Sequence, residues 1–214
     1  MNSTFTFVHS APQTTEVTKK YPAIFLIHGM GSNENDLVGL VSSLKETCHI
    51  FSIRGPIAQP PGYAFFTIEG YGKPHRAVFD QVIKDLQAFI EAVVEEYPID
   101  SEQLFLLGFS QGAILSQSLA LIMGNQIKGI VALSGYIPAF VKEEYARQPV
   151  NKLNAFISHG EIDNVLPYEW GVASKEYFTE QGANVTFKSY PVAHGVAADN
   201  HRDLLAFLNK KLVE

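Results

Sequence analysis

The pentapeptide G-F-S-Q-G at residues 108–112 constrains the fold of this chain more than any other feature. It follows the apolar run Leu104 to Leu107 and precedes an apolar helical stretch from Ala113 to Met123. A G-x-S-x-G pentapeptide between a strand and a helix typically forms a sharp turn that lifts the serine hydroxyl above the end of a sheet. The flanking glycines keep side chains out of the gap between strand and helix. The pattern therefore predicts a strand–turn–helix unit with Ser110 as a nucleophile.

Apolar runs of strand length alternate with helical patterns along the chain. The runs are continuously apolar, which indicates strands covered on both faces, as in a parallel sheet. The segment Ser3 to His9 instead alternates apolar and polar residues and is expected to form an antiparallel edge strand. The sequence thus predicts one α/β domain over residues 1–214, with helices on both faces of a mostly parallel sheet. The predicted buried strands are residues 23–27, 49–53, 104–107, 127–133, 155–157 and 185–190.

Helical segments occupy the intervals between these strands. The clearest runs from about His75 to Tyr97, where apolar residues recur at three- and four-residue steps and Pro98 ends the pattern. Shorter helices are expected at residues 36–45, 168–181 and 199–212. Gly182 is expected to serve as a C-cap and Asp199 as an N-cap.

The composition is that of an ordinary globular protein, with 46% hydrophobic and 18% charged residues. A formal net charge of -6 argues against nucleic acid or an anionic membrane surface as the main partner. The single cysteine, Cys48, excludes an internal disulfide and fits a reducing compartment. We see no signal-peptide pattern at the N-terminus and no apolar run of membrane-spanning length. We therefore expect a cytoplasmic protein without membrane insertion.

A serine nucleophile needs a base and an acid that orients the base. Such groups gather at the carboxyl ends of the strands in an open α/β sheet. Asp163 and Glu161 are the candidate acids, because both lie in the loop after strand 155–157. His194, between the last strand and the last helix, is the candidate base, and His159 is its rival. The order serine, acid, His194 along the chain is the order expected for this architecture, which favours His194.

The oxyanion hole should combine the residue after the nucleophile with a loop that follows an early strand. The loop H-G-M-G at residues 28–31 follows the strand that ends at Ile27. We therefore expect the backbone N–H groups of Met30 and Gln111 to form the hole. His28 is expected to have a structural role, and Ser134 is the serine to test after Ser110.

Taken together, five segments resemble the phospholipase/carboxylesterase family of α/β-hydrolases, which includes the acyl-protein thioesterases. They are residues 28–37, 54–56, 108–112, 159–167 and 193–195. The resemblance implies an α/β-hydrolase fold and a serine esterase that uses no metal and no organic cofactor. It also selects Asp163 over Glu161 as the acid. Met30 stands where the family more commonly has Leu or Gly, so we expect a reshaped acyl site but an unchanged backbone N–H.

Two further segments bear on the substrate. Residues 55–74 form a long connection rich in aromatic residues, and we expect it to supply one wall of an acyl pocket through Phe65 and Phe66. The alternative is that this connection packs on the surface of the sheet. The stretch from Ser134 to Asn154 can hold a short helix but no lid domain, which predicts an open site suited to small acyl groups.

The sequence therefore predicts a serine carboxylesterase that hydrolyses small acyl esters through an acyl-enzyme, with no nucleic-acid partner. Acyl-thioesters and lysophospholipids are alternative substrates. A dienelactone is less favoured, because enzymes for that substrate usually carry cysteine at the position of Ser110. An alternative of another class is a binding protein that keeps the fold without catalysis. The leaving group, the acyl-chain length and the oligomeric state stay open, with a homodimer as one option.

Overall fold

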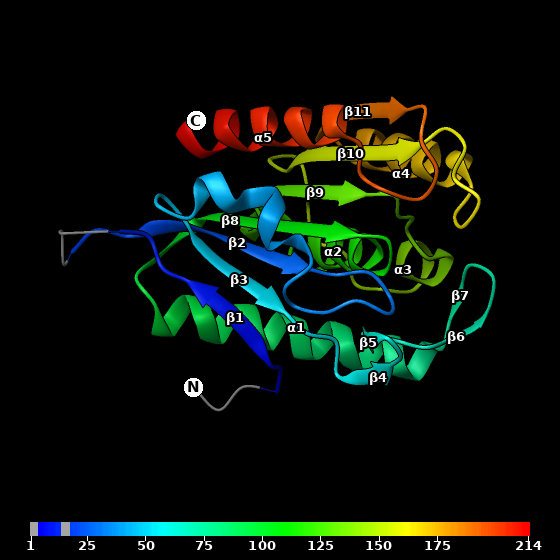
Figure 1. Cartoon of the computed structure of the whole chain (residues 1–214), viewed down its shortest axis with the longest axis horizontal. Helices are drawn as coiled ribbons and strands as arrows, with labels where there is room; N and C mark the ends of the chain where they lie inside the picture. Colours follow the sequence, from blue (N-terminus) through cyan, green and yellow to red (C-terminus); the bar gives the residue numbers. More distant parts are fainter. Residues whose placement is uncertain (1–3, 14–17) are drawn as a thin grey trace.

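The computed structural model describes residues 4–13 and 18–214. Its central feature is a seven-stranded sheet with the order β1-β3-β2-β8-β9-β10-β11 (Figure 1). Strand β1 pairs antiparallel with β3, and every other neighbouring pair is parallel. The mostly parallel sheet and its antiparallel edge strand agree with the prediction, although Ser3 lies outside the described residues. The strands are β1 Phe7–Ser10, β2 Tyr21–Ile27, β3 His49–Ile53, β8 Ile99–Phe109, β9 Gly129–Leu133, β10 Asn154–Gly160 and β11 Asn184–Tyr190.

Continuous hydrophobicity in the inner strands reflects two hydrophobic clusters, one on each face of the sheet. In β2, Phe25 and Ile27 enter one cluster, whereas Ile24 and Leu26 enter the other. Successive side chains of a strand point to opposite faces, so a strand buried on both faces must be apolar at every position. This is the physical basis of the pattern seen in the sequence.

The helices form two layers around the sheet (Figure 1). Helices α1 (Arg76–Glu96), α2 (Gln111–Met123), α3 (Ala139–Glu143) and α4 (Tyr168–Glu180) contribute to the cluster on one face. The 3-10 helix η1 (Leu37–Leu44) and α5 (Ala198–Val213) contribute to the cluster on the other. A short 3-10 turn, η2 (Gly124–Gln126), continues α2. The three-layer arrangement agrees with the predicted α/β-hydrolase fold.

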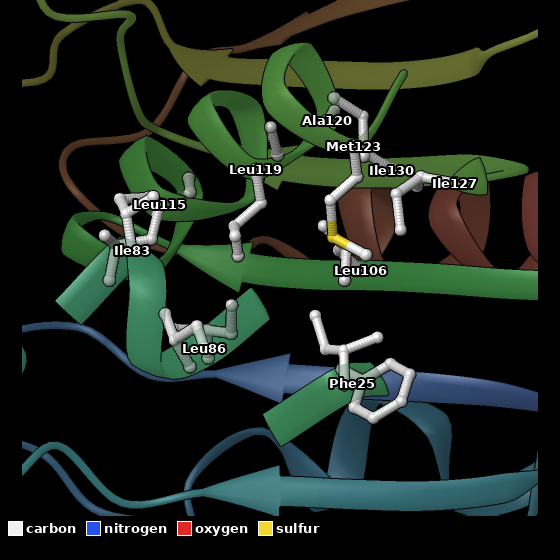
Figure 2. Packing of buried hydrophobic residues seen from close by; sticks show 14 of the residues in the cluster. Phe25, Ile83, Leu86, Leu106, Leu115, Leu119, Ala120, Met123, Ile127 and Ile130 are labelled. Carbon is white, nitrogen blue, oxygen red and sulfur yellow. The ribbon is translucent and has the colours of Figure 1, made fainter. Parts of the chain in front are cut away.

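Figure 2 shows how α1 and α2 pack on the sheet. Side chains of Leu115 and Leu119 on α2 lie between Leu106 of β8 and the α1 residues Ile83 and Leu86. These side chains are at most 4% exposed. Helix α2 is buried around almost its whole circumference, so its position relative to the sheet is tightly constrained.

Of the two helix caps predicted from the sequence, the structure confirms Gly182 and contradicts Asp199. Gly182 follows α4 with a φ of +85°, and its N–H donates to the Thr179 carbonyl, as a C-cap glycine does. Asp199 is not the N-cap of α5, which begins at Ala198 after Ala197. Asp199 lies in the first helical turn and accepts a hydrogen bond from Arg202, where its charge still complements the positive end of the helix.

The connection from Gly55 to Pro74 contains two small hairpins. Strands β4 (Ile57–Gln59) and β5 (Gly62–Ala64) form the first, and β6 (Ile68–Gly70) and β7 (Lys73–Pro74) form the second. Between Ser134 and Asn154 the structure places one short helix, α3. The site therefore has no lid domain, as the length of this segment predicted.

A pair of histidines joins the edge strand β1 to the sheet. His9 Nε2 and His49 Nδ1 are 3.0 Å apart, and the His9 ring stacks on Phe51 with a centroid separation of 4.2 Å. Burial, together with the neighbouring His9, lowers the pKa of His49 to about 4. His49 thus stays neutral in the folded protein at pH values where a histidine in the unfolded chain is already protonated.

Replacing both rings by phenylalanine should make the protein less sensitive to acid. The unfolded chain binds a proton near pH 6.5 and folded His49 near pH 4, so stability is lost as the pH falls through this window. Between pH 7 and 4.5, the free energy of unfolding should fall by about 1–3 kcal/mol less in His9→Phe/His49→Phe than in wild type. Urea unfolding measures this difference. His201→Gln is the control, and equal losses in wild type and the double variant would contradict the prediction.

Candidate active site

The turn between β8 and α2 places Ser110 in a strained backbone conformation. Its φ of +52° and ψ of -114° lie outside the regions that residues other than glycine normally occupy. The turn is held by the Ser110 N–H, which donates to the Leu133 carbonyl over 2.9 Å. Ser110 is half-buried at the carboxyl end of β8, so its side chain stands at the entrance to the helix.

Both glycines of the pentapeptide are required by close backbone packing. A Cβ on Gly112 would lie 1.7 Å from the Ile27 carbonyl oxygen, and one on Gly108 would lie 2.2 Å from the carbonyl carbon of Gly112. No side chain fits at either position without moving the helix. The structure therefore gives the physical reason for the pentapeptide that the sequence contains.

The Gln111 N–H and the loop that carries Met30 lie next to Ser110. Gln111 is the first residue of α2, so its N–H has no carbonyl partner within the helix. The loop that carries Met30 approaches from β2, because a Cβ on Gly29 would lie 3.4 Å from the Ser110 Cβ. In the described part of the chain, the Met30 N–H makes no backbone hydrogen bond. These are the two amides that the sequence suggested for an oxyanion hole.

His28 is a structural residue of this loop. Its Nδ1 donates to the Gly29 carbonyl over 2.7 Å, and its Nε2 accepts the Gly55 N–H over 3.0 Å. This bonding requires the neutral ring, and burial lowers the His28 pKa. The ring is 2% exposed, so it cannot reach a substrate.

A charged pair that sequence reasoning missed supports the same loop. Arg54 Nε donates to Glu34 Oε2 over 2.6 Å, and Nη2 donates to the other carboxylate oxygen. The guanidinium also lies over the ring of Tyr63, 4.6 Å from its centroid, and the Tyr63 carbonyl accepts the Gly31 N–H. The bond from Arg54 lowers the pKa of Glu34. The sequence signal for this ion pair was the presence of opposite charges in two of the family-like segments, residues 28–37 and 54–56.

Asp163 and His194 form a buried acid–base pair. His194 Nδ1 donates to Asp163 Oδ2 over 2.7 Å, and Asp163 Oδ1 accepts the N–H groups of Val165 and Leu166 over 2.8 and 2.9 Å. Burial raises the pKa of Asp163, but the hydrogen bonds from His194 and the two amides outweigh this effect and lower it. The carboxylate side chain is 0% exposed and that of His194 is 14% exposed, so the free imidazole edge is the accessible part of the pair.

Close contact between the acid and base loops holds this pair together. A Cβ on Gly160 would lie 2.4 Å from the carbonyl oxygens of Val192 and Ala193. The Glu161 N–H donates to the Tyr190 carbonyl over 2.8 Å. Because β10 and β11 are parallel neighbours, their carboxyl ends deliver both loops to the same edge of the sheet.

The rival acid and base lie in different environments. Glu161 is exposed and accepts a hydrogen bond from the Ser189 hydroxyl, so it makes no contact with His194. His159 is 1% exposed, and its Nε2 lies 3.0 Å from the Leu166 carbonyl and 3.4 Å from Asp163 Oδ2. His159 therefore supports the acid loop from inside the protein and has no access to a substrate.

Phe109 connects the Ser110 turn with the His194 imidazole. The Phe109 ring is next to Ser110 in the chain and 4.9 Å from the His194 ring. Among the described residues, the Ser110 hydroxyl and His194 form no hydrogen bond. Catalytic hydrogen bonds are often long before substrate binds and shorten in the complex.

Phe65 and Phe66 do not form the substrate wall that the sequence suggested. Their side chains are 0% and 1% exposed and belong to the hydrophobic core. Their backbone groups instead fasten the connection to the nucleophile turn, because the Phe65 N–H donates to Gln111 Oε1 and Gln111 Nε2 donates to the Phe66 carbonyl. The aromatic rings are inside because burying them removes a large apolar area from water.

A cavity of about 220 Å³ lies at the carboxyl end of the sheet. Its lining comes from the segment after β9, from α3 and α4, and from the turn between β6 and β7. Figure 1 shows these segments beyond the arrowheads of the central strands, at the end of the sheet that carries Ser110. Sequence reasoning did not find this cavity, whose larger side chains are Tyr136, Ile137, Lys142, Trp170 and Ser174.

Comparison with known proteins shows the family of this chain. Residues 13–212 match the model of the phospholipase/carboxylesterase family. This chain belongs to that family. Acyl-protein thioesterase 1 of Debaryomyces hansenii is 27% identical, over 89% of this chain and 91% of the relative. Acyl-protein thioesterase 1 of Candida albicans is 28% identical, over 90% of this chain and 92% of the relative.

Solved structures share the fold of this family member. The carboxylesterase of Bacillus cereus superposes with a TM-score of 0.87 at 22% identity, covering 98% of this chain and 96% of the other. SOBER1 of Arabidopsis thaliana superposes with a TM-score of 0.75 at 20% identity, covering 90% and 99%. The family and its relatives identify the protein as a hydrolase that acts on esters.

The described residues contain no group of three or more His, Cys, Asp or Glu side chains that could hold a metal ion. None of the helices within residues 4–13 and 18–214 combines the length and apolarity needed to cross a bilayer.

Asp163→Asn should lower kcat severely, by a factor that approaches ~10⁴ if the carboxylate orients the imidazole as in serine proteases. Glu161→Gln is the matched control, because Glu161 is near in sequence but bonds Ser189 instead of His194. Steady-state kinetics on a soluble ester, with circular dichroism as a folding check, measures both. Similar losses in the two variants would show that the acid is elsewhere.

Proposed function

We propose that this protein is a serine carboxylesterase in which Ser110, His194 and Asp163 act together on small acyl esters. The observation that supports this proposal best is the buried Asp163–His194 pair, whose imidazole contacts Phe109, the residue before Ser110 in the strained turn. A structural histidine would not need an accessible imidazole edge and a fully buried carboxylate. An ester hydrolase needs both, because the base must reach the serine while its partner stays fixed.

Each residue has a defined part in the proposed reaction. His194 removes the proton from the Ser110 hydroxyl as its oxygen forms a bond to the acyl carbon. The N–H groups of Met30 and Gln111 stabilise the oxyanion, each by a few kcal/mol as in other such sites (about 2.7–4). His194 then gives the proton to the departing alcohol or thiol. Water repeats the sequence on the acyl-enzyme and releases the acid.

Asp163 keeps the His194 imidazole in the tautomer that can accept the proton of Ser110. Its bond to Nδ1 leaves Nε2 without a proton and directs it outward. Because two backbone amides also hold the carboxylate, its charge persists without a second cation. The negative charge stabilises the imidazolium that forms after proton transfer.

We further propose that the cavity lined by Tyr136 and Trp170 receives the acyl group. The segment that carries Tyr136 follows β9, and Gly135 packs on Ala113, three residues after Ser110. Helix α4, which carries Trp170, begins directly after the Asp163 loop. At about 220 Å³ the cavity is smaller than a typical site for drug-sized ligands, about 300–1,000 Å³.

The leaving group in the proposed reaction is an alcohol, and a thiol is the main alternative. Relatives named acyl-protein thioesterase favour the thiol. A non-catalytic binding protein is the alternative of another class. The presence of a serine at the turn together with the Asp163–His194 pair argues against it, because binding alone gives no reason to keep a nucleophile, a base and an acid.

Ser110→Ala should abolish ester hydrolysis and labelling by a fluorophosphonate probe. The fold should persist, because the half-buried side chain makes no core contact that alanine would lose. Labelling detected by mass spectrometry and turnover of p-nitrophenyl butyrate test the two effects. Ser134→Ala is the control, since the buried Ser134 lies one strand away. Turnover by Ser110→Ala near the wild-type rate would exclude Ser110 as the nucleophile.

Short acyl chains should be hydrolysed faster than long ones. A cavity of about 220 Å³ closed by α4 limits the length of chain that can be buried, and the absence of a lid domain predicts no rate increase when substrate forms micelles. Rates on p-nitrophenyl acetate, butyrate, octanoate and palmitate measure the preference. A maximum at palmitate would contradict it and favour an acylated protein or a lipid.

Cytoplasmic location, a homodimer and the absence of a nucleic-acid partner stay predictions from the sequence. The net charge of -6 supports the last of these.

A further inference from the structure

The proposed acyl pocket carries polar side chains for which an alkyl chain offers no hydrogen-bond partner. Apart from Ile137 and small residues, its lining consists of Tyr136, Lys142, Trp170 and Ser174. All four side chains carry hydrogen-bond donors, and the lining contains no aspartate or glutamate. The pocket therefore combines one positive charge with several donors and no negative charge.

Two of these donors have no hydrogen-bond partner among the described residues, and the Ser174 hydroxyl is also buried. The Ser174 hydroxyl is inaccessible to solvent and has no hydrogen bond, and the residue is 2% exposed. Tyr136 is 8% exposed, and its hydroxyl makes no hydrogen bond with any described residue. Burial raises the pKa of Tyr136 to about 12, so its hydroxyl keeps its proton at neutral pH and can donate. Buried polar groups are rarely left unpaired, and such a pair lining a cavity points to a ligand that accepts hydrogen bonds.

Lys142 adds a charge that the protein itself does not neutralise. It is half-buried at the end of α3, and no carboxylate in the described residues lies within ion-pair distance of its ammonium group. Its recorded contact is with the ring of Tyr177, whose centroid is 5.8 Å away. An ammonium group without a counter-ion favours an anionic ligand, because a hydrogen bond to a charged acceptor is about twice as strong as one between neutral groups.

We propose that this pocket selects acyl groups that end in a carboxylate, so that the preferred substrates are half-esters of short dicarboxylic acids such as succinate or glutarate. The proposal rests on the proposed function. The distal carboxylate accepts hydrogen bonds from Lys142, Tyr136 and Ser174, while the ester carbonyl lies at Ser110. Hydrolysis cleaves the bond between the acyl carbon and the leaving oxygen and releases the free dicarboxylate and an alcohol.

A neutral acyl chain of the same length is a poorer ligand for physical reasons. It removes water from the ammonium and hydroxyl groups but offers them no acceptor. A site built to hydrogen-bond a substrate discriminates strongly against an analogue that lacks the bonding group. One charged hydrogen bond corresponds to a preference of roughly 10-fold or more.

The first experiment compares pairs of esters that differ in the terminal group. Monoethyl succinate is paired with ethyl butyrate, and monoethyl glutarate with ethyl valerate, with acid release followed by pH-stat. We expect kcat/KM to be at least about 10-fold higher for the half-ester in one pair. In Lys142→Met this ratio should fall to near one. Lys152→Met, which removes a lysine at the opposite end of the sheet, should keep the wild-type ratio.

The second experiment measures binding without catalysis. Trp170 is the one tryptophan of the chain and lines the pocket, so its fluorescence reports occupancy directly. Glutarate should change this fluorescence at a concentration roughly 10-fold lower than valerate, and Lys142→Met should remove the difference. High salt should weaken the glutarate effect more than the valerate effect.

The two experiments separate failure of the inference from failure of the proposed function. Hydrolysis that needs Ser110 but shows no half-ester preference, together with no glutarate effect on Trp170, would overturn the inference alone. Lys142-dependent binding of glutarate without hydrolysis of any ester would overturn the function and leave the pocket assignment standing. An equal gain from ethyl 4-hydroxybutyrate would show that the site selects a neutral polar end, which contradicts the proposal.

Discussion

The close contact between the start of α2 and the end of β2 is the constraint on which the site depends. The Ile27 carbonyl occupies the space that any side chain at position 112 would need. Because the helix approaches this closely, the chain must reverse within one residue, and Ser110 takes the strained conformation that results. Packing of α2 between α1 and the sheet holds the strain in place (Figure 2).

The same contact sets the positions of the neighbouring loops. Gln111 extends from the first turn of α2 and bonds the backbone of Phe65 and Phe66 on both sides of its amide. The loop after β2 lies against the turn at Gly29 and is braced from outside by the Glu34–Arg54 pair. In the proposed mechanism these contacts hold two amides beside the serine before the reaction begins, which is the condition for electrostatic stabilisation of an oxyanion.

The acid–base pair is built on a separate part of the sheet and has its own support. Burying a carboxylate is costly unless it is fully hydrogen-bonded. Asp163 meets this condition through His194 and two amides of its own loop. His159 lies beneath the loop and bonds the Leu166 carbonyl, so the loop is held from the inside as well. In the proposed function, the selectivity for the acyl group depends on α3 and α4, which carry none of the proposed catalytic residues.

The sequence by itself determined the elements that local patterns encode. Continuous apolar runs specified the strands, the pentapeptide specified the turn at Ser110, and the chain order of serine, acid and histidine specified which loops meet. It did not determine whether Phe65 and Phe66 lie in the core or line a pocket, because a buried ring and a pocket ring occur in the same local sequence pattern. The boundary of α5 at Ala198 and the hairpins between Gly55 and Pro74 were likewise settled by tertiary contacts.

The cavity was decided only by the tertiary structure. Tyr136, Lys142 and Ser174 come from segments that are far apart in sequence and carry no shared motif. Whether Tyr136 packs in the core or faces a ligand depends on where α4 lies relative to β9, and that is set by burial summed over the whole domain. Local sequence therefore specifies the reactive groups, whereas the shape and charge of the space around them arise from packing between distant segments.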